Sequence, residues 1–253
     1  TMKQASNKTK RSTGPSLIRM ISVLFGVIIA TVPFHMFAKQ TANDTSFNAI
    51  LLSFASGIIA ASLLATIVEW TVHRFAMHRG KRFPLFRIAT ELHHKAHHWV
   101  HYTPNNYIAT KPLNRPSVLA KDKTELCESK FVIMLTTLSH GAFYTFLTVP
   151  ILVAAWKITF NFWFTAAMVF AASIFIYLFI RVHDAVHHPG LSFLENFKWF
   201  WFLDKHHYIH HIDNNVNTNF LLPLTDLLMG TLRQNMTLEE KKMWPSYTET
   251  RQA

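Results

Sequence analysis

Four long stretches of the chain contain no Asp, Glu, Lys or Arg, and charged segments separate most of them. The charge-free stretches are residues 20–38, 45–68, 131–156 and 158–180. About 20 apolar residues in a helix, rising about 1.5 Å each, cross a hydrocarbon core of about 30 Å. The pattern therefore predicts an all-α integral membrane protein with four transmembrane helices.

The third and fourth stretches are separated only by Lys157, which predicts a tight helical hairpin. Residues 1–16 are rich in Lys, Ser and Thr, and we expect a flexible basic N-terminal arm there. The remainder, 17–253, is expected to form a single membrane domain. Its transmembrane helices are expected at about 20–38, 45–72, 131–156 and 158–182. The aromatic stretch 191–203 is too short to span and is typical of a helix lying at the bilayer interface.

The distribution of charge predicts the orientation. The chain has 25 Lys plus Arg against 14 Asp plus Glu, a formal net charge of +11. Five of the basic residues precede the first stretch and eleven lie in the segment 74–130, whereas the other two connections carry almost none. By the positive-inside rule, both termini and the 74–130 segment face the cytoplasm. Topology thus accounts for most of the excess charge, and no nucleic-acid partner is expected.

Fourteen of the sixteen histidines fall into four clusters on the expected cytoplasmic side. The clusters are His73 and His78; His93, His94, His97, His98 and His101; His183, His187 and His188; and His206, His207, His210 and His211. Most members follow i, i+3 and i+4 spacing, which places side chains on one face of an α-helix. The pair five residues apart in the first cluster would point about 140° apart on such a helix, toward different metals or across a helix end.

Neutral imidazole is a common metal ligand that suits Fe, Zn, Cu and Ni. About ten candidate ligands fit two metal ions better than one, since one ion takes four to six. The single Cys127 excludes a site built from several thiolates. Two histidines, His35 and His101, are interpreted as ordinary polar residues. His140 lies within the third stretch, where an ionisable residue is a functional candidate or a neutral hydrogen-bonding group.

Carboxylates close to the histidines are candidates to accept a hydrogen bond from the ring nitrogen that does not bind metal, and so to orient the imidazole rings. These are Glu69, Glu91, Asp184, Asp204 and Asp213. Soluble carboxylate-bridged di-iron bundles need two Glu-x-x-His motifs, and only Glu91-x-x-His94 is present. The sequence therefore disfavours that class.

The set of motifs resembles the fatty acid hydroxylase/sterol desaturase superfamily of membrane di-iron enzymes. The motifs read His73-x4-His78, His94-x2-His97-His98, His183-x3-His187-His188 and His207-x2-His210-His211. The sequence Asp226-x3-Gly230-Thr231-x-Arg233 is similar to that family's ending, and Asn217 or Asn219 takes the place of an Asn that precedes it. The resemblance covers about residues 66–233.

The resemblance implies four spans and a cytoplasmic cap of helices that carries a His-rich dimetal site. The cofactors implied are two iron ions, which zinc could replace in purified protein, with O2 as co-substrate. The implied ligands are His73, His78, His94, His97, His98, His183, His187, His207, His210 and His211. The ambiguous neighbours are His93, His188 and His206.

The expected function is O2-dependent hydroxylation of an aliphatic C–H bond of a lipid, such as a fatty acyl chain or a sterol, that enters from the bilayer. The sequence has no haem, flavin or dinucleotide-binding motif, so a separate protein such as a cytochrome b5 or ferredoxin is expected to donate electrons. An acidic donor could dock on the basic 74–130 segment. If the donor docks there, neutralising Lys111, Arg115, Lys121 and Lys123 should change turnover and its salt dependence.

Three alternatives stay open. Glu69-Trp70 and His183-Asp184 are also similar to carotenoid-ring hydroxylases, and a sterol desaturase would use the same scaffold. A metal transporter or metal-storage protein is the non-enzymatic alternative, although transporters place their sites near the bilayer midplane. The absence of a fused electron-donor domain favours a bacterial inner membrane over the endoplasmic reticulum.

Overall fold

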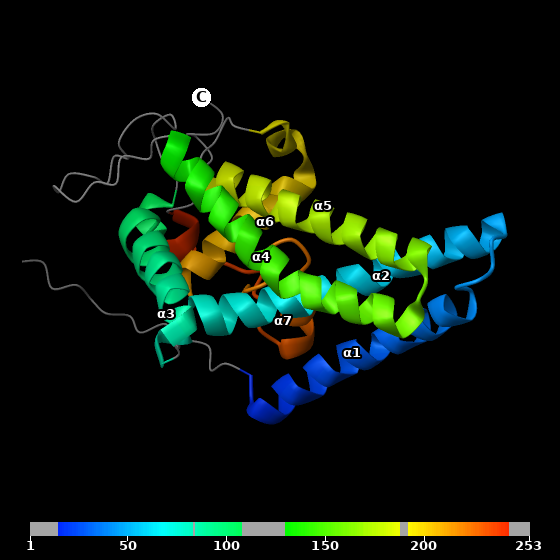
Figure 1. Ribbon diagram of the computed structural model, residues 1–253. Helices are drawn as coiled ribbons and strands as arrows, with labels where there is room; N and C mark the ends of the chain where they lie inside the picture. Colours follow the sequence, from blue (N-terminus) through cyan, green and yellow to red (C-terminus); the bar gives the residue numbers. More distant parts are fainter. Residues whose placement is uncertain (1–14, 83, 108–129, 188–191, 243–253) are drawn as a thin grey trace, which may run out of the picture.

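The computed structural model describes residues 15–82, 84–107, 130–187 and 192–242 (Figure 1). This part of the chain is helical and contains no strand. Three helices are long and apolar enough to cross a membrane. They are α1 (Leu17–Gln40), α2 (Phe47–Thr71) with its continuation to Met77, and α5 (Phe162–His187). The prediction of an all-helical membrane protein is confirmed at this level.

The helix α4 (Lys130–Thr159) precedes α5 and is joined to it by a two-residue turn at Phe160 and Asn161. Its part with described side chains, Tyr144–Thr159, is an apolar helix. Figure 1 shows α1, α2, α4 and α5 running alongside one another, and the turns that join them lie at one end. The hairpin expected around Lys157 is therefore present in the structure.

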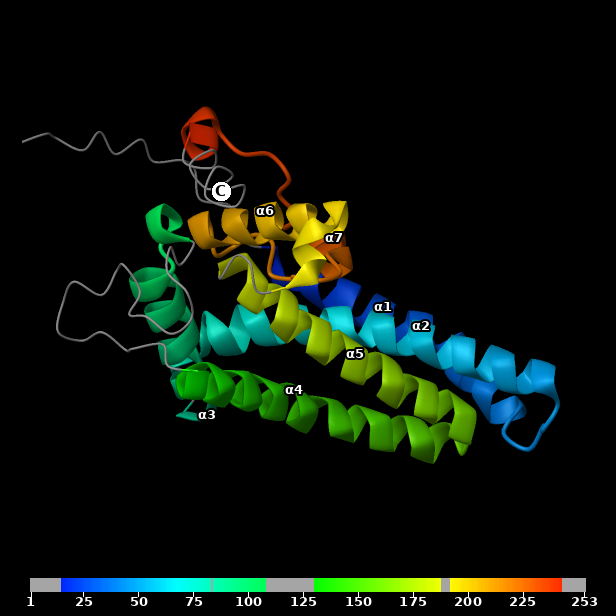
Figure 2. The same ribbon diagram turned by 90° about the horizontal axis from the view of Figure 1, so that it is seen from above.

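Short helices gather at the opposite end of the long ones (Figure 2). They are the π-helices η1 (Val72–Met77) and η3 (Glu91–His101), the 3-10 helices η2 (Gly80–Arg82), η4 (Pro104–Asn106) and η5 (Phe193–Asn196), and the α-helices α3 (Pro84–Thr90), α6 (Lys198–Ile212) and α7 (Leu224–Met229). All histidines of the four predicted clusters that the structure describes belong to this end.

The aromatic stretch 191–203 forms two helices rather than the single one expected. A capping box between Ser192 and Glu195 starts the 3-10 helix η5, and extended backbone at Phe197 ends it. The following α6 continues to Ile212 and carries four histidines. Phe193 and Trp199 are exposed, which fits the predicted contact with the bilayer interface.

Small residues let α2 and α5 approach closely. A Cβ atom placed on Gly57 would lie 2.4 Å from the carbonyl oxygen of Phe164 and 2.8 Å from the Cβ atom of Ala167. Close backbone approach through small residues is typical of membrane helix pairs, where dispersion contacts and not water exclusion drive association. This contact fixes the spacing of two helices that both continue into the histidine-rich end.

Gly57→Ala is expected to lower the free energy of unfolding by about 1–3 kcal/mol, because the added methyl group meets a backbone atom that cannot move aside. The matched control is Gly26→Ala on α1, where an added Cβ meets nothing within 4 Å. Thermal unfolding in detergent would compare the two. Equal stability of both variants would contradict the close α2–α5 contact.

Asn161 joins the helical hairpins at the turn end. Its buried side-chain amide donates to the carbonyl oxygen of Ala38 (2.9 Å) and to the hydroxyl groups of Thr41 (3.3 Å) and Ser53 (3.2 Å). Its Oδ1 accepts from the backbone N–H of Phe164 (2.9 Å). One side chain thus connects α1, α2 and α5, and the register of the long helices is fixed far from the histidines.

Candidate metal centre

The histidines converge in two sets, and within each set one ligand atom from every residue lies within 4.8 Å of the others. The first set is His73, His78, His93, His98 and His210, and the second is His97, His187, His207 and His211. Each set takes residues from at least three elements. The sets adjoin, since the rings of His98 and His211 stack with centroids 4.0 Å apart.

Two π-helices explain which histidines meet. In a π-helix the backbone bonds run from i to i+5, so residues five apart approach one another. The rings of His73 and His78 stack with centroids 5.0 Å apart, and the N–H of His78 donates to the carbonyl of His73 (3.2 Å). Likewise Nε2 of His93 lies 3.2 Å from Nε2 of His98. The 140° separation assumed an α-helix and does not hold: both residues join the first set, and His78 lies at the end of η1, so the pair lies across a helix end and does not reach different metals.

Backbone carbonyl groups hold four of the rings from behind. In each case Nδ1 lies within hydrogen-bond distance of a carbonyl oxygen. The pairs are His73 with Thr218 (2.7 Å), His210 with Val216 (2.7 Å), His187 with Tyr107 (2.8 Å) and His211 with Tyr102 (2.6 Å). Because a carbonyl only accepts, Nδ1 carries the proton and Nε2 carries a lone pair directed into the set.

These lone pairs meet one another in the second set. Nε2 of His207 lies 3.2 Å from Nε2 of His187 and 3.1 Å from Nε2 of His211. If Nε2 of His207 carries no proton, both contacts bring two lone pairs together, and if it carries one, a single N–H is shared between two acceptors. A cation bound between the nitrogens would replace this repulsion by ligation.

The spacing of the nitrogens also fits a shared ion. Two nitrogens that ligate one ion at about 2.0–2.1 Å lie about 3.0–3.4 Å apart. In the first set, Nε2 of His73 lies 3.0 Å from Nε2 of His93, and Nε2 of His78 lies 3.0 Å from Nε2 of His210. Nε2 of His97 is buried and has no hydrogen-bond partner in the described part of the chain. Both sets therefore have the donors and spacing that hold a metal ion.

Burial keeps these imidazoles neutral. It is the largest cause of lowered pKa values in the sets, and the neighbouring imidazoles lower them further. The histidines whose pKa lies well below the usual value are His78, His93, His97, His98, His207 and His210. Burial also lowers the pKa of His211 to about 3, although its bond to Tyr102 opposes the shift.

These pKa values predict acid sensitivity of the metal-free protein. An unfolded histidine titrates near pH 6.5, so below that pH the unfolded chain binds more protons than the folded one. The stability that the neutral buried histidines contribute to the folded protein is thus fully present above about pH 6.5. It is lost as the pH falls from there toward the lowered pKa values. We expect the thermal unfolding temperature in detergent to fall steeply between pH 7 and pH 5.

Bound metal is expected to add stability above about pH 6.5 and to be released at lower pH, because protons and metal compete for the same lone pairs. Metal retention after desalting at each pH would be measured beside the unfolding temperature. A constant unfolding temperature from pH 7 to pH 5 would contradict the neutral, buried state of the sets.

Two predicted ligands lie beside the sets. Nδ1 of His94 is 2.7 Å from Nδ1 of His78, at the edge of the first set. The ring of His183 has its centroid 4.9 Å from those of His97 and His207, at the edge of the second. Of the ambiguous residues, His93 joins the first set. The side chains of His101, His140 and His188 lie outside the described residues.

His206 is placed differently from its neighbours on α6. Its Nε2 donates to the carbonyl oxygen of Asn219 (2.6 Å), outside both sets. The first of the four adjacent histidines of α6 thus supports a loop, and the other three face the sets.

Three of the carboxylates near the histidines, Glu69, Glu91 and Asp213, bind groups other than imidazole. Glu69 is buried and accepts from the backbone N–H of Phe220 (2.7 Å) and from the amide of Asn219 (3.2 Å). Glu91 forms a surface ion pair with Lys95, and Asp213 accepts from the N–H of Asn215 (3.0 Å). Asp184 is partly buried on α5, and the backbone carbonyl of Asp204 accepts from the hydroxyl of Tyr107 (3.2 Å). Four of the rings receive this support from backbone carbonyl groups.

An apolar groove between α2, α4 and α5 leads toward the sets. It contains about 470 Å³ of empty space, part of it open to the surroundings. Its walls are Ala61, Leu64, Ala65, Val68, Ile151, Leu152, Met168, Ala172, Phe175 and Ile176, and its polar members are Glu69, Tyr144 and Thr148. Glu69 lies one helical turn before His73, so the groove follows α2 toward the first set.

Aromatic rings connect the groove with the second set. The ring centroid of Phe179 is 5.1 Å from that of Tyr144 and 5.8 Å from that of Phe220. The Phe220 ring in turn lies 4.8 Å from His207. Apolar rings therefore lie between Tyr144, at the polar end of the groove, and His207 of the second set.

No family model, curated protein or solved structure matches this chain. The basic residues expected to dock an electron donor, Lys111, Arg115, Lys121 and Lys123, lie outside the described residues. The chemistry of this protein is therefore inferred from its histidine sets and their surroundings.

Proposed function

We propose that this protein is an O2-dependent membrane di-iron oxygenase that hydroxylates an aliphatic C–H bond of a lipid. The observation that carries the proposal is the pair of adjoining, all-histidine sets, with lone pairs directed inward, at one end of membrane-capable helices. Buried imidazole lone pairs that face one another repel, and a metal ion bound between them would replace this repulsion by ligation. The motif resemblance supports the same reaction class.

Imidazole nitrogen suits iron, and the motif resemblance is to iron enzymes, so iron is the metal proposed. Bound iron would supply the activation of O2. In the overall reaction the lipid and O2, with two electrons and two protons, give the hydroxylated lipid and one water. The electrons require a separate carrier protein, for which a cytochrome b5 or a ferredoxin is the chemical type proposed.

The chain's own residues would hold the metals and position the substrate. The carbonyl groups behind the rings keep each proton on Nδ1, so that Nε2 stays a ligand. The apolar groove would bind the hydrocarbon part of the lipid, and Phe179 and Phe220 would exclude water near the reacting carbon. A desaturase would use the same parts, and the product distinguishes the two reactions.

The proposed topology has four membrane spans, because α4 is added to α1, α2 and α5. The short helices form a cytoplasmic cap. Its support is the 30-residue length of α4 and the excess of basic residues at the histidine-rich end. A bacterial inner membrane is the proposed location. Labelling of single cysteines placed in the 41–46 turn and in α7 from each side of a vesicle would test the orientation.

The direct test uses protein reconstituted with ferrous iron in lipid vesicles, a reductant-coupled donor protein and oxygen-18 gas. The proposal expects a lipid product that contains one labelled oxygen, formed only when iron, O2 and donor are all present. A product that lacks two hydrogens and contains no label would identify a desaturase. Metal movement across the vesicle with no O2 consumption would reject the oxygenase and favour a transporter.

A further inference from the structure

The two histidine sets are oriented by two separate segments. Carbonyl groups of the segment 216–219 bind Nδ1 of His210 and His73, both in the first set. Carbonyl groups of Tyr102 and Tyr107 bind Nδ1 of His211 and His187, both in the second set. A residue that holds only one of these segments can therefore affect one set without the other.

Asp226 fixes the segment 216–219 by hydrogen bonds from its carboxylate. Its carboxylate accepts from the hydroxyl of Thr218 (3.0 Å), from the backbone N–H of Asn219 (2.5 Å) and from the hydroxyl of Thr231 (2.5 Å). The side chain is fully buried. A charged acceptor with three donors in a buried place forms strong, geometrically defined bonds. Two of its three donors belong to residues that flank the carbonyl bound by His73.

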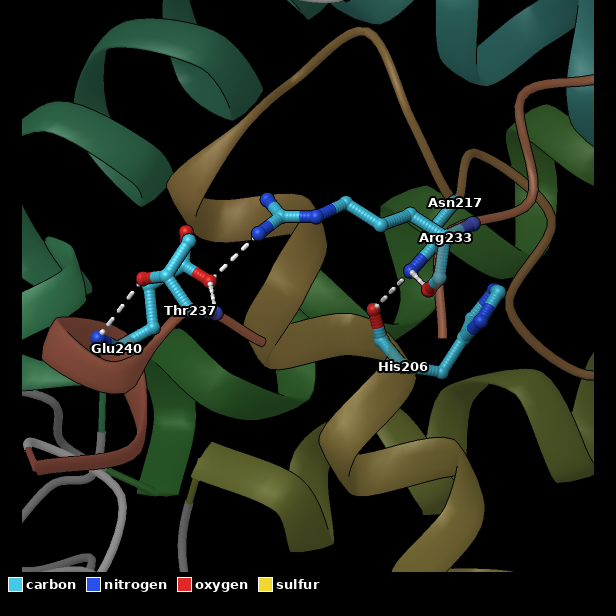
Figure 3. A network of polar contacts seen from close by, with 5 residues as sticks. All are labelled: His206, Asn217, Arg233, Thr237 and Glu240. Carbon is cyan, nitrogen blue, oxygen red and sulfur yellow. Dashed lines mark hydrogen bonds and ion pairs between the residues drawn. The ribbon is translucent and has the colours of Figure 1, made fainter. Parts of the chain in front are cut away.

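Asn217 and Asn219 fix the same segment from other directions. The amide of Asn219 donates to the carbonyl of Thr66 on α2 (2.7 Å), and its Oδ1 accepts from the N–H of Asp226 (3.1 Å). Figure 3 shows Asn217 between the backbone of His206 on α6 and Arg233, and its amide donates to the carbonyl groups of both.

Arg233 in turn forms an ion pair with Glu240, which also accepts from the backbone N–H of Thr237 (2.7 Å; Figure 3). The segment 216–219 is therefore tied to α2, to α6 and to the chain beyond α7. Among these contacts, Asp226 is the group that binds both the side chain of Thr218 and the N–H that follows its carbonyl group.

We propose that Asp226 is a positioning residue for one metal only: through the segment 216–219 it orients His73 and His210, and so sets the affinity of the first histidine set while leaving the second unchanged. This inference rests on the dimetal site of the proposed function. It concerns metal affinity and does not depend on which reaction the metals support.

The physical reason lies in the donors around the carboxylate. Asp226→Asn keeps the shape but removes the charge, and its amide N–H₂ must face either the Asn219 N–H, which cannot accept, or the two threonine hydroxyl groups, which must then turn from donating to accepting. The Thr218 carbonyl then moves, and the rings of His73 and His210 lose a fixed direction. Disturbing partners that orient metal-bound histidines typically lowers metal affinity 10–100-fold. The second set keeps its carbonyl groups, since in the described part of the chain the Asp226 carboxylate bonds to Thr218, Asn219 and Thr231 and not to Tyr102 or Tyr107.

The test titrates metal-free protein in detergent with Zn²⁺ for stoichiometry and with Co²⁺ for its visible absorption spectrum. Wild type is expected to bind two ions. Asp226→Asn is expected to bind one ion with unchanged affinity and the other about 10–100-fold more weakly, with a changed Co²⁺ band for that ion only. Thr218→Val removes one of the three donors and is expected to weaken the same ion by less.

The control variant is Thr41→Val, which removes a partly buried hydroxyl bonded to Ser53 (2.9 Å) at the turn end of the helices. It is expected to bind both ions as wild type does. Equal weakening of both ions in Asp226→Asn, or no weakening of either, would overturn the role of Asp226. Failure of wild type to bind any metal would instead overturn the dimetal site of the proposed function.

Discussion

His210→Ala is expected to remove one of two bound metal ions, and His207→Ala is expected to remove the other. His210 is fully buried, and its Nε2 lies 3.0 Å from that of His78 in the first set. His207 is the residue whose Nε2 contacts both His187 and His211 in the second set. Loss of a ligand should lower the affinity of its ion by more than about 100-fold, since loss of an orienting partner alone costs 10–100-fold.

Turnover is expected to disappear in both variants, because the proposed reaction needs both ions. Metal analysis after gel filtration, together with O2 consumption, would measure the two effects. His35→Ala is the matched control: His35 lies on α1 and its Nδ1 donates to the carbonyl of Thr31 (2.8 Å), so both ions should be retained. Retention of two ions in either cluster variant would contradict the assignment of the sets.

Ala65→Phe and Ala172→Phe are expected to abolish lipid turnover with metal content unchanged. Both alanines line the apolar groove, on α2 and α5, and a phenyl ring at either position fills the space proposed for the hydrocarbon chain. A shift of the reacting carbon by about 1 Å can cost about 100-fold in rate. Exclusion of the chain should therefore lower turnover by at least about 100-fold.

The control for the groove is Ala55→Phe, an exposed position on the same helix as Ala65. It should turn over lipid as wild type does. Crosslinking of a fatty acid that carries a photoreactive group would report binding independently of turnover. Normal turnover and crosslinking in Ala65→Phe and Ala172→Phe would show that the substrate binds elsewhere.

The sequence predicted the helical membrane architecture because charge-free runs of sufficient length have few alternatives in a hydrocarbon solvent. It also placed the clustered histidines together at one end of the helices. The four-box spacing included eight of the nine residues whose nitrogens converge in the structure. These features are local in the chain, and composition and spacing carry them directly.

The sequence predicted less well which histidines group together, since α-helical spacing was assumed where the backbone is a π-helix. This is why His93 was ambiguous although it faces His73 and His98. The partners behind the rings were also missed, because backbone carbonyl groups leave no signature in side-chain sequence. Asp226 had no assigned role for a related reason: its contacts join Thr218, Asn219 and Thr231, and only the folded loop brings those donors to one carboxylate.

The central claim is that the two histidine sets bind two metal ions, and metal content tests it most directly. Protein purified in detergent from cells grown with iron would be analysed for iron and zinc per chain. If the two sets each bind one ion, we expect about two ions per chain in wild type and in His35→Ala, and about one in His210→Ala. Wild-type protein that contains less than one ion per chain, and takes up none when ferrous iron or zinc is added, would contradict it.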